Sequence, residues 1–128
     1  YLFWEGFPDT ATWNQKEGYC VAGADTASFL RQTLSKLGLT PREYNEFIVY
    51  WLPQMQQNPY NLITFQWEEY ERIAPLTITP APDSVLRVFM VFTPMNELID
   101  IKAPAERPAF TRKGFTVVEW GASKIDYH

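Results

Sequence analysis

The stretch TPREYNEFIVYWLPQM, from Thr40 to Met55, decides the fold because it is the most apolar helix candidate in the chain. Thr40 is expected to be the N-cap, with Pro41 as the first helical residue and Glu43 completing a capping box. The residues from Phe47 to Leu52 are all apolar or aromatic, so no side of this part of the helix is suited to water. We therefore predict a central helix with a well-marked start.

Helix signals on both sides of Thr40 predict a helical hairpin. A preceding helix is expected from about Thr26 to Leu37, with Asp25 as its N-cap and Gly38 as its C-terminal stop. Only Leu39 separates Gly38 from Thr40, so the two helices must turn sharply against each other. The second helix is expected to end or kink at Pro53, because proline disfavours helical geometry at the residue before it.

The rest of the chain shows the alternation and composition of strands. The strongest strand, Val85–Thr93, is apolar on both faces, which is typical of the centre of a sheet. A strand, two helices and then several strands predict an α+β fold, with the helical hairpin packed on a mainly antiparallel sheet in a single compact domain over residues 1–128. Further strands are expected at 1–5, 18–21, 60–67, 98–101 and 115–120, with a helical turn at 68–73, a surface loop at 102–114 and a polar tail from 121.

Composition narrows the class of function. A net charge of -4 with scattered lysines and arginines gives no basic surface for nucleic acid. No apolar run approaches the roughly 18 residues of a membrane-spanning helix. One cysteine and one histidine leave no Cys-rich zinc site or His-based triad, so no metal and no cofactor are expected. The chain opens inside a predicted strand without Met or a targeting segment, so we expect a piece of a longer protein.

Three charges fall where strand alternation places apolar neighbours: Glu5, Arg87 and Glu119. Burying any of them alone would cost several kcal/mol, so they should pair with one another or reach a cleft. The favoured interpretation is a structural ion pair through Arg87. The alternative is a Glu5 and Glu119 carboxylate pair, with Arg87 beside it, performing the acid and base chemistry of a glycan-directed hydrolase or transferase.

The central helix carries two further candidates for binding, Glu46 and Tyr50. A local ion pair of Glu46 with Arg42 is the simpler explanation. If Glu46 and Tyr50 instead face the sheet, they could join the strand charges.

Cys20 and Trp13 are the remaining candidates. Cys20 precedes a predicted helix and could act as a nucleophile near its N-terminus, but a lone cysteine with apolar neighbours is far more often a small core residue. Trp13 lies in a polar loop and is the tryptophan expected to be available for a ligand or partner.

Several segments together resemble one family. They are YLFWEG at 1–6, GYCVAGADTASFL at 18–30, LGLTPREYNEFIVYWLPQM at 37–55, YNLITFQ at 60–66, PDSVLRVFMVF at 82–92 and RKGFTVVEWG at 112–121. The chain resembles an uncharacterised module of bacterial secreted proteins and lipoproteins, chiefly from Firmicutes, that usually follows a β-rich region introduced by a KPVIYLYP-type motif. That motif is absent from this sequence. The resemblance implies an extracytoplasmic setting, secreted or at the cell envelope, and transfers no catalytic residue.

Two functions follow as hypotheses. The first is a non-catalytic extracytoplasmic module that binds an envelope glycan, peptide or protein partner. The second is a cell-wall or glycan-directed enzyme that uses Glu5, Glu119 and Arg87, or less readily Cys20.

Overall fold

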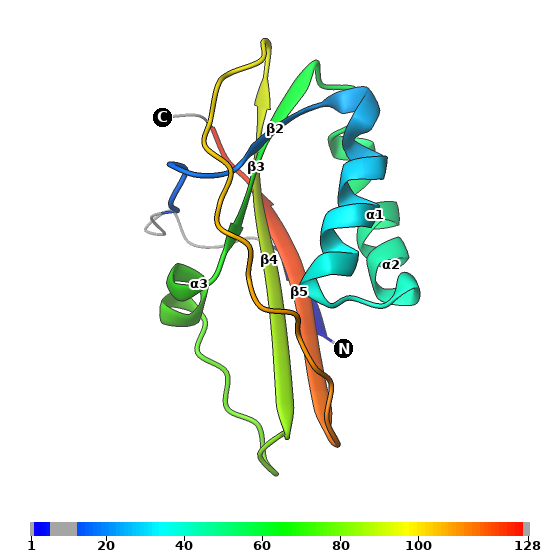
Figure 1. Cartoon of the computed structure of the whole chain (residues 1–128), viewed down its shortest axis with the longest axis vertical. Helices are drawn as coiled ribbons and strands as arrows, with labels where there is room; N and C mark the ends of the chain where they lie inside the picture. The colour runs from blue at the N-terminus through cyan, green and yellow to red at the C-terminus, as the bar shows by residue number, and fades with distance from the viewer. Residues whose placement is uncertain (1, 6–12, 127–128) are drawn as a thin grey trace.

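The computed structural model describes residues 2–5 and 13–126, the first of these ranges by its backbone alone. Two helices lie against one face of a five-stranded sheet, and a short third helix lies on the other side (Figure 1). The elements in chain order are β1 (Leu2–Glu5), β2 (Tyr19–Ala22), α1 (Thr26–Leu37), α2 (Pro41–Trp51), β3 (Tyr60–Gln66), α3 (Glu68–Ile73), β4 (Ser84–Met95) and β5 (Thr116–Lys124).

The start of α2 is the predicted capping box. The Thr40 hydroxyl accepts a hydrogen bond from the Glu43 N–H at 3.3 Å, and the Thr40 N–H donates to the Glu43 carboxylate at 2.9 Å. The helix ends at Trp51, and a 3₁₀ turn over Leu52–Gln54 follows, as Pro53 predicts. Each end of the central helix is therefore determined by local sequence.

The start of α1 differs from the prediction. Asp25 makes no side-chain capping bond, because a 3₁₀ turn over Gly23–Asp25 leads directly into the helix. The Thr26 hydroxyl instead donates to the Ala22 carbonyl at 3.1 Å. Gly38 ends α1 in the left-handed conformation, with φ 118°, as expected for a C-terminal glycine.

The α+β architecture with a helical pair on the sheet is confirmed. The strand order is β1-β5-β4-β3-β2. The pairs β2–β3 and β3–β4 are antiparallel, whereas β4–β5 and β5–β1 are parallel. The sheet is thus mixed, antiparallel on the β2–β3–β4 side and parallel on the β4–β5–β1 side, with β4 buried between β3 and β5.

Buried apolar side chains of the helices and the sheet form two clusters, one on each face of the sheet. The larger lies under α1 and α2 and includes Phe47, Trp51 and Trp120. The smaller, on the α3 side, is centred on Tyr70, Phe89 and Val91. Because both faces are covered, β4 is buried along most of its length, as its sequence predicts.

Two strand predictions were wrong. The expected strand at 98–101 does not form, and only an isolated bridge between Lys102 and Glu17 is found nearby. The last strand continues to Lys124, beyond the Trp120 at which it was expected to end, because it pairs with β4 as far as Phe92. None of the helices in the described ranges is long and apolar enough to span a membrane.

Candidate functional site

Arg87 and Glu119 form an ion pair across the parallel strands β4 and β5. They are register partners, and the Arg87 Nε atom lies 2.9 Å from the Glu119 Oε1 atom. Both side chains are buried, at 6% and 4% exposure. Glu119 also accepts a hydrogen bond from the Tyr70 hydroxyl. This is the structural ion pair expected from the sequence, with a tyrosine added.

Aromatic rings enclose this ion pair. The Arg87 guanidinium lies over the Tyr70 ring, 4.4 Å from its centroid, and Tyr70 stacks on Phe89 at 4.6 Å. Trp13 stacks on the same phenylalanine at 5.2 Å. Trp13 is therefore half-buried against the smaller apolar cluster, where its ring contributes to packing. That Trp13 also contacts a ligand or partner stays a prediction.

Arg87 also reaches toward α3. Its Nη1 atom lies 3.8 Å from a Glu71 carboxylate oxygen and makes no hydrogen bond within the described part of the chain. The side chain of Glu5 lies outside the described residues. Its backbone pairs with Ala122, whereas Leu2 is the β1 residue opposite Glu119. The register thus places Glu5 three positions along β1 from the residue beside Glu119.

The candidates on α2 face away from the sheet. Glu46 forms the predicted ion pair with Arg42, at 3.6 Å on the exposed helix surface. Tyr50 is 40% exposed and contacts Trp51 edge-on at 5.0 Å. Neither residue approaches the Arg87 and Glu119 pair, so α2 is structural on its sheet side.

Cys20 is a half-buried free thiol on β2. Its neighbour Val21 packs into the cluster under α1 and α2. Strand alternation therefore directs Cys20 to the opposite face, away from the N-terminus of α1.

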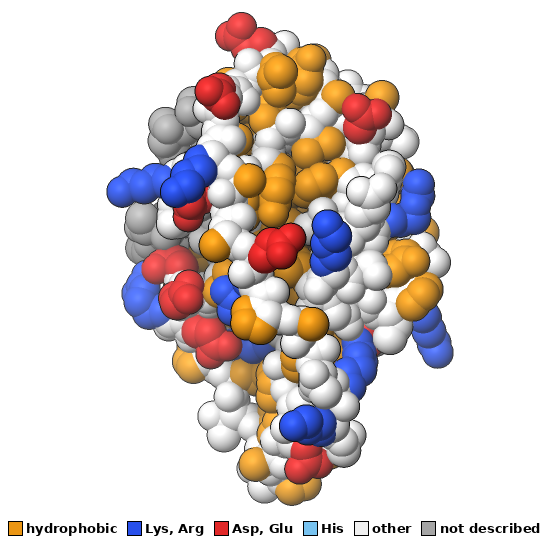
Figure 2. All heavy atoms as spheres, in the orientation of Figure 1, with side chains coloured by type: hydrophobic (Ala, Val, Ile, Leu, Met, Phe, Trp, Pro, Cys, Tyr) orange, Lys and Arg blue, Asp and Glu red, His pale blue; other side chains and the backbone are white. Residues whose placement is uncertain are grey.

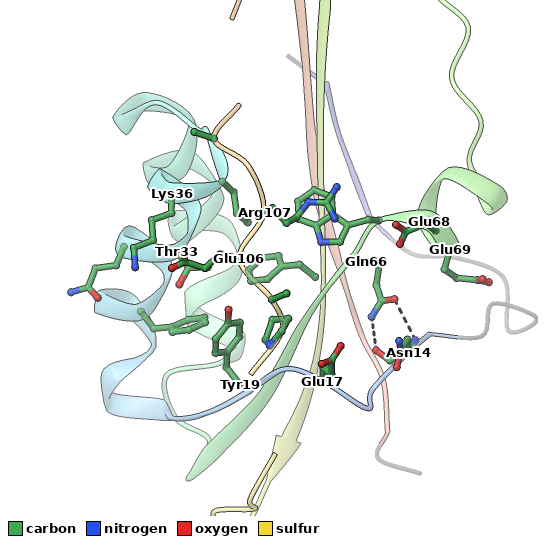
Figure 3. A pocket seen from close by; sticks show the side chains of 18 residues that line it. Asn14, Glu17, Tyr19, Thr33, Lys36, Gln66, Glu68, Glu69, Glu106 and Arg107 are labelled. Carbon is green, nitrogen blue, oxygen red and sulfur yellow. Dashed lines mark hydrogen bonds between the residues drawn. The ribbon is translucent and has the colours of Figure 1, made fainter. Parts of the chain in front are cut away.

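The described residues form a groove that the sequence did not predict. It lies between α1, the ends of β2 and β3, and residues 103–109, which we call the strap (Figure 3). Four partly buried aromatic residues line it, namely Tyr19, Phe29, Phe65 and Trp67. Its polar lining comes from Asn14, Glu17, Gln32, Thr33, Lys36, Gln66, Glu68, Glu69, Glu106 and Arg107.

The strap is anchored at both ends and extended between them. Before it, the Gly18 N–H donates to the Lys102 carbonyl at 2.9 Å. After it, Arg112 donates to the Gly38 carbonyl at 3.0 Å and also binds Glu43. Within the described residues, no hydrogen bond involves positions 103–109, and the Arg107 guanidinium rests on the Trp67 ring at 3.9 Å. One wall of the groove is therefore held by its ends and by a single stacked side chain.

Gln66 holds the opposite wall. Its buried amide accepts a hydrogen bond from the Asn14 N–H at 3.3 Å and donates to the Asn14 carbonyl at 2.9 Å (dashed in Figure 3). It also donates to the Thr64 hydroxyl at 2.8 Å. The side chain thereby fixes the course of the chain as it enters β2.

Charges of both signs are interspersed over this side of the molecule (Figure 2). Within the groove, burial and then the negative charge of Glu106 raise the pKa of the Tyr19 hydroxyl. Tyr19 and Phe29 contact each other at 5.1 Å, so this end of the groove combines aromatic surface with a carboxylate. Such a site can hold a ligand by stacking and hydrogen bonding without forming a covalent bond.

No cluster of three or more His, Cys, Asp or Glu side chains that could hold a metal ion is found within residues 2–5 and 13–126.

The sequence gives a weak signal for the groove. Trp67 and Glu68 follow a predicted strand, and Arg107 lies in a segment without a helical or strand periodicity of apolar residues. Nothing in the sequence indicates that Trp67 and Arg107 meet.

No family model, curated protein or solved structure matches this chain.

Proposed function

We propose that this chain is a non-catalytic binding module of an exported bacterial protein and that an envelope glycan or peptide binds in the groove beside the strap. The observation that carries this proposal is that four aromatic residues line one groove. They are Tyr19 from β2, Phe29 from α1, Phe65 from β3 and Trp67 directly after β3. Binding sites for small molecules and short polymers typically combine aromatic surface with a few polar groups.

The buried ion pair supports a binding role over acid and base chemistry. Glu119 is held by Arg87 and Tyr70 together, and neither Arg87 nor Glu119 lines the groove. A carboxylate fixed by two donors in a closed cluster has the features of a structural network.

The extracytoplasmic setting is part of the proposal and rests on the family resemblance. Protease treatment of intact cells that make the full-length protein tests it. We expect the module to be digested without lysis, and protection until the cells are broken would contradict this setting.

Ligand binding is tested with immobilised envelope glycans and peptides, using the wild-type chain and a variant that fills the groove. Ala105 is exposed and lines the groove, so Ala105→Trp should block binding without disturbing the core. Ala103→Trp is the matched control, because Ala103 is an exposed residue of the same strap that does not line the groove. Binding that both variants retain equally, or no binding of any glycan or peptide, would contradict the proposal.

A further inference from the structure

The end of β3 that borders the groove lacks a neighbouring strand. The β2–β3 ladder begins at the pair Tyr19 and Ile63, so β3 continues past it through Phe65 and Gln66. On its other side, β3 remains paired with β4, where Phe65 is opposite Met90. One edge of β3 is therefore open next to the groove.

The main chain of Phe65 faces this open edge. The Pro59 carbonyl accepts a hydrogen bond from the Gly23 N–H, so it points toward β2. A Cβ atom at Gly18 would lie 2.7 Å from the Ile63 carbonyl oxygen, so that carbonyl points the same way. Main-chain groups of alternate residues point to the same edge of a strand, which directs the N–H and C=O groups of Phe65 into the groove.

In the described part of the chain these Phe65 groups have no main-chain partner, because the β2–β3 ladder stops at Ile63 and no bond from a turn or loop reaches them. Gln66 holds the Asn14 main chain, and the Gly18 N–H donates to the Lys102 carbonyl, so neither of these residues leading into β2 hydrogen-bonds to this edge. An unpaired strand edge is a template for an added strand, since its donors and acceptors match those of an extended peptide.

The charges beside this edge favour a ligand with a positively charged group. Glu68 and Glu106 are exposed carboxylates of the groove, and neither forms an ion pair with another described residue. Glu106 lies close enough to the Tyr19 hydroxyl for its charge, after burial, to raise the pKa of that hydroxyl. Lys36 and Arg107 also line the groove, but its four carboxylates, Glu17, Glu68, Glu69 and Glu106, outnumber them.

We propose that the ligand is an extended peptide that adds to the open edge of β3 through the main chain of Phe65 and places a Lys or Arg side chain beside Glu106 and Tyr19. This inference rests on the proposed function and narrows its ligand to a peptide. The strap would lie along the outer side of the bound peptide, since its main chain at 103–109 makes no hydrogen bond to the other described residues.

The test uses acetylated, amidated heptapeptides of alternating Val and Thr with a central Lys, added to the intact chain. We expect saturable binding and slower hydrogen exchange of the Phe65 amide. A central Glu should weaken binding by about fivefold, as expected for one exposed ion pair. The Lys peptide methylated on its main-chain nitrogens should not bind, because it cannot pair with a strand edge.

Variants of the protein give a second measurement. Glu106→Gln should weaken binding of the Lys peptide by about two- to fivefold, and Glu97→Gln, an exposed residue outside the groove, should not change it. Equal binding of the methylated peptide, or unchanged exchange at Phe65 when the Lys peptide is bound, would overturn the inference. Binding of glycans alone, blocked by Ala105→Trp, would overturn it and leave the proposed function standing, whereas no binding of either class would overturn both.

Discussion

Arg87 donates from Nε to Glu119 Oε1 at 2.9 Å across the parallel pair of β4 and β5, and both side chains are buried. A buried charge is stable only when an opposite charge and hydrogen bonds compensate for its loss of water. Arg87 and Glu119 compensate for each other in this way, and the Tyr70 hydroxyl donates a further hydrogen bond to Glu119. The pair therefore holds the β4–β5 ladder in register on the α3 side of the sheet.

Removing Arg87 alone should be strongly destabilising, because Glu119 would be left as a buried, incompletely compensated charge. We expect Arg87→Met to lower the free energy of unfolding by about 3–5 kcal/mol, measured by urea denaturation. The double variant Arg87→Met/Glu119→Leu should recover most of this loss, because it leaves no unpaired charge.

The control for this prediction is Arg42→Met on the surface of α2. Arg42 is exposed, and its ion pair with Glu46 should be worth no more than about 1 kcal/mol. A loss of stability in Arg87→Met no larger than in Arg42→Met would contradict a structural role for the buried pair.

Glu43 should make stability depend on acid pH. Burial alone would raise the pKa of this carboxyl, but hydrogen bonds and charge from Arg112, with the Thr40 N–H, lower it overall. Because the pKa is lower in the folded chain than in the unfolded chain, the stabilisation is complete above about pH 5 and is lost as the pH falls through the folded-state value. Glu43→Gln should therefore reduce stability at neutral pH and flatten its decline in acid.

Thermal unfolding of Glu43→Gln between neutral and acid pH checks this prediction. Glu46→Gln serves as the matched control on the same helix, since its ion pair is exposed. If the wild type and Glu43→Gln lose stability in parallel as the pH falls, the carboxyl of Glu43 does not contribute as described.

Gly23 should not accept a side chain. A Cβ atom there would lie 1.9 Å from the Asn58 carbonyl oxygen and 2.7 Å from that of Gln56, and both are main-chain atoms. Gly23→Ala should lower the free energy of unfolding by about 1–3 kcal/mol or more, because the turn before α1 must move. Ala24→Gly, at the exposed next residue, should cost less than about 1 kcal/mol, and an equal effect of the two changes would refute the close approach.

The titration of Tyr19 should report the charge of Glu106. Burial and then Glu106 raise the Tyr19 pKa above 10.0, so Glu106→Gln should lower it without restoring that value. The difference in tyrosinate absorbance between each protein and its Tyr19→Phe counterpart isolates this one tyrosine. A Tyr19 pKa that Glu106→Gln leaves unchanged or raises would show that Glu106 does not act on the groove.

Much of the fold was predictable because its signals are local. The capping box of Thr40 and Glu43 and the stop at Pro53 set the ends of α2. Arg87 and Glu119 could be paired in advance, because both interrupt apolar alternation on strands. The prediction of Asp25 as the N-cap of α1 was wrong because the chain forms a 3₁₀ turn before that helix. No local sequence signal distinguishes such a turn from a capped helix start.

The groove was not predictable from sequence patterns. It depends on contacts between distant segments, such as Arg107 on Trp67 and Gln66 on the Asn14 main chain. Likewise, the parallel pairing of β5 with β4 depends on the path of the chain between them. The sequence could not reveal it, because apolar and polar residues alternate in the same way in parallel and antiparallel strands. The open edge at Phe65 exists only because β2 ends its pairing at Tyr19.

The most direct test of the groove as a peptide site is a charge swap at Glu106. Calorimetric titration compares the Val and Thr heptapeptides with central Lys or central Glu on the wild type and on Glu106→Lys. We predict that the wild type prefers the Lys peptide and that Glu106→Lys prefers the Glu peptide. The same preference in both proteins, or no binding to either, would contradict the account.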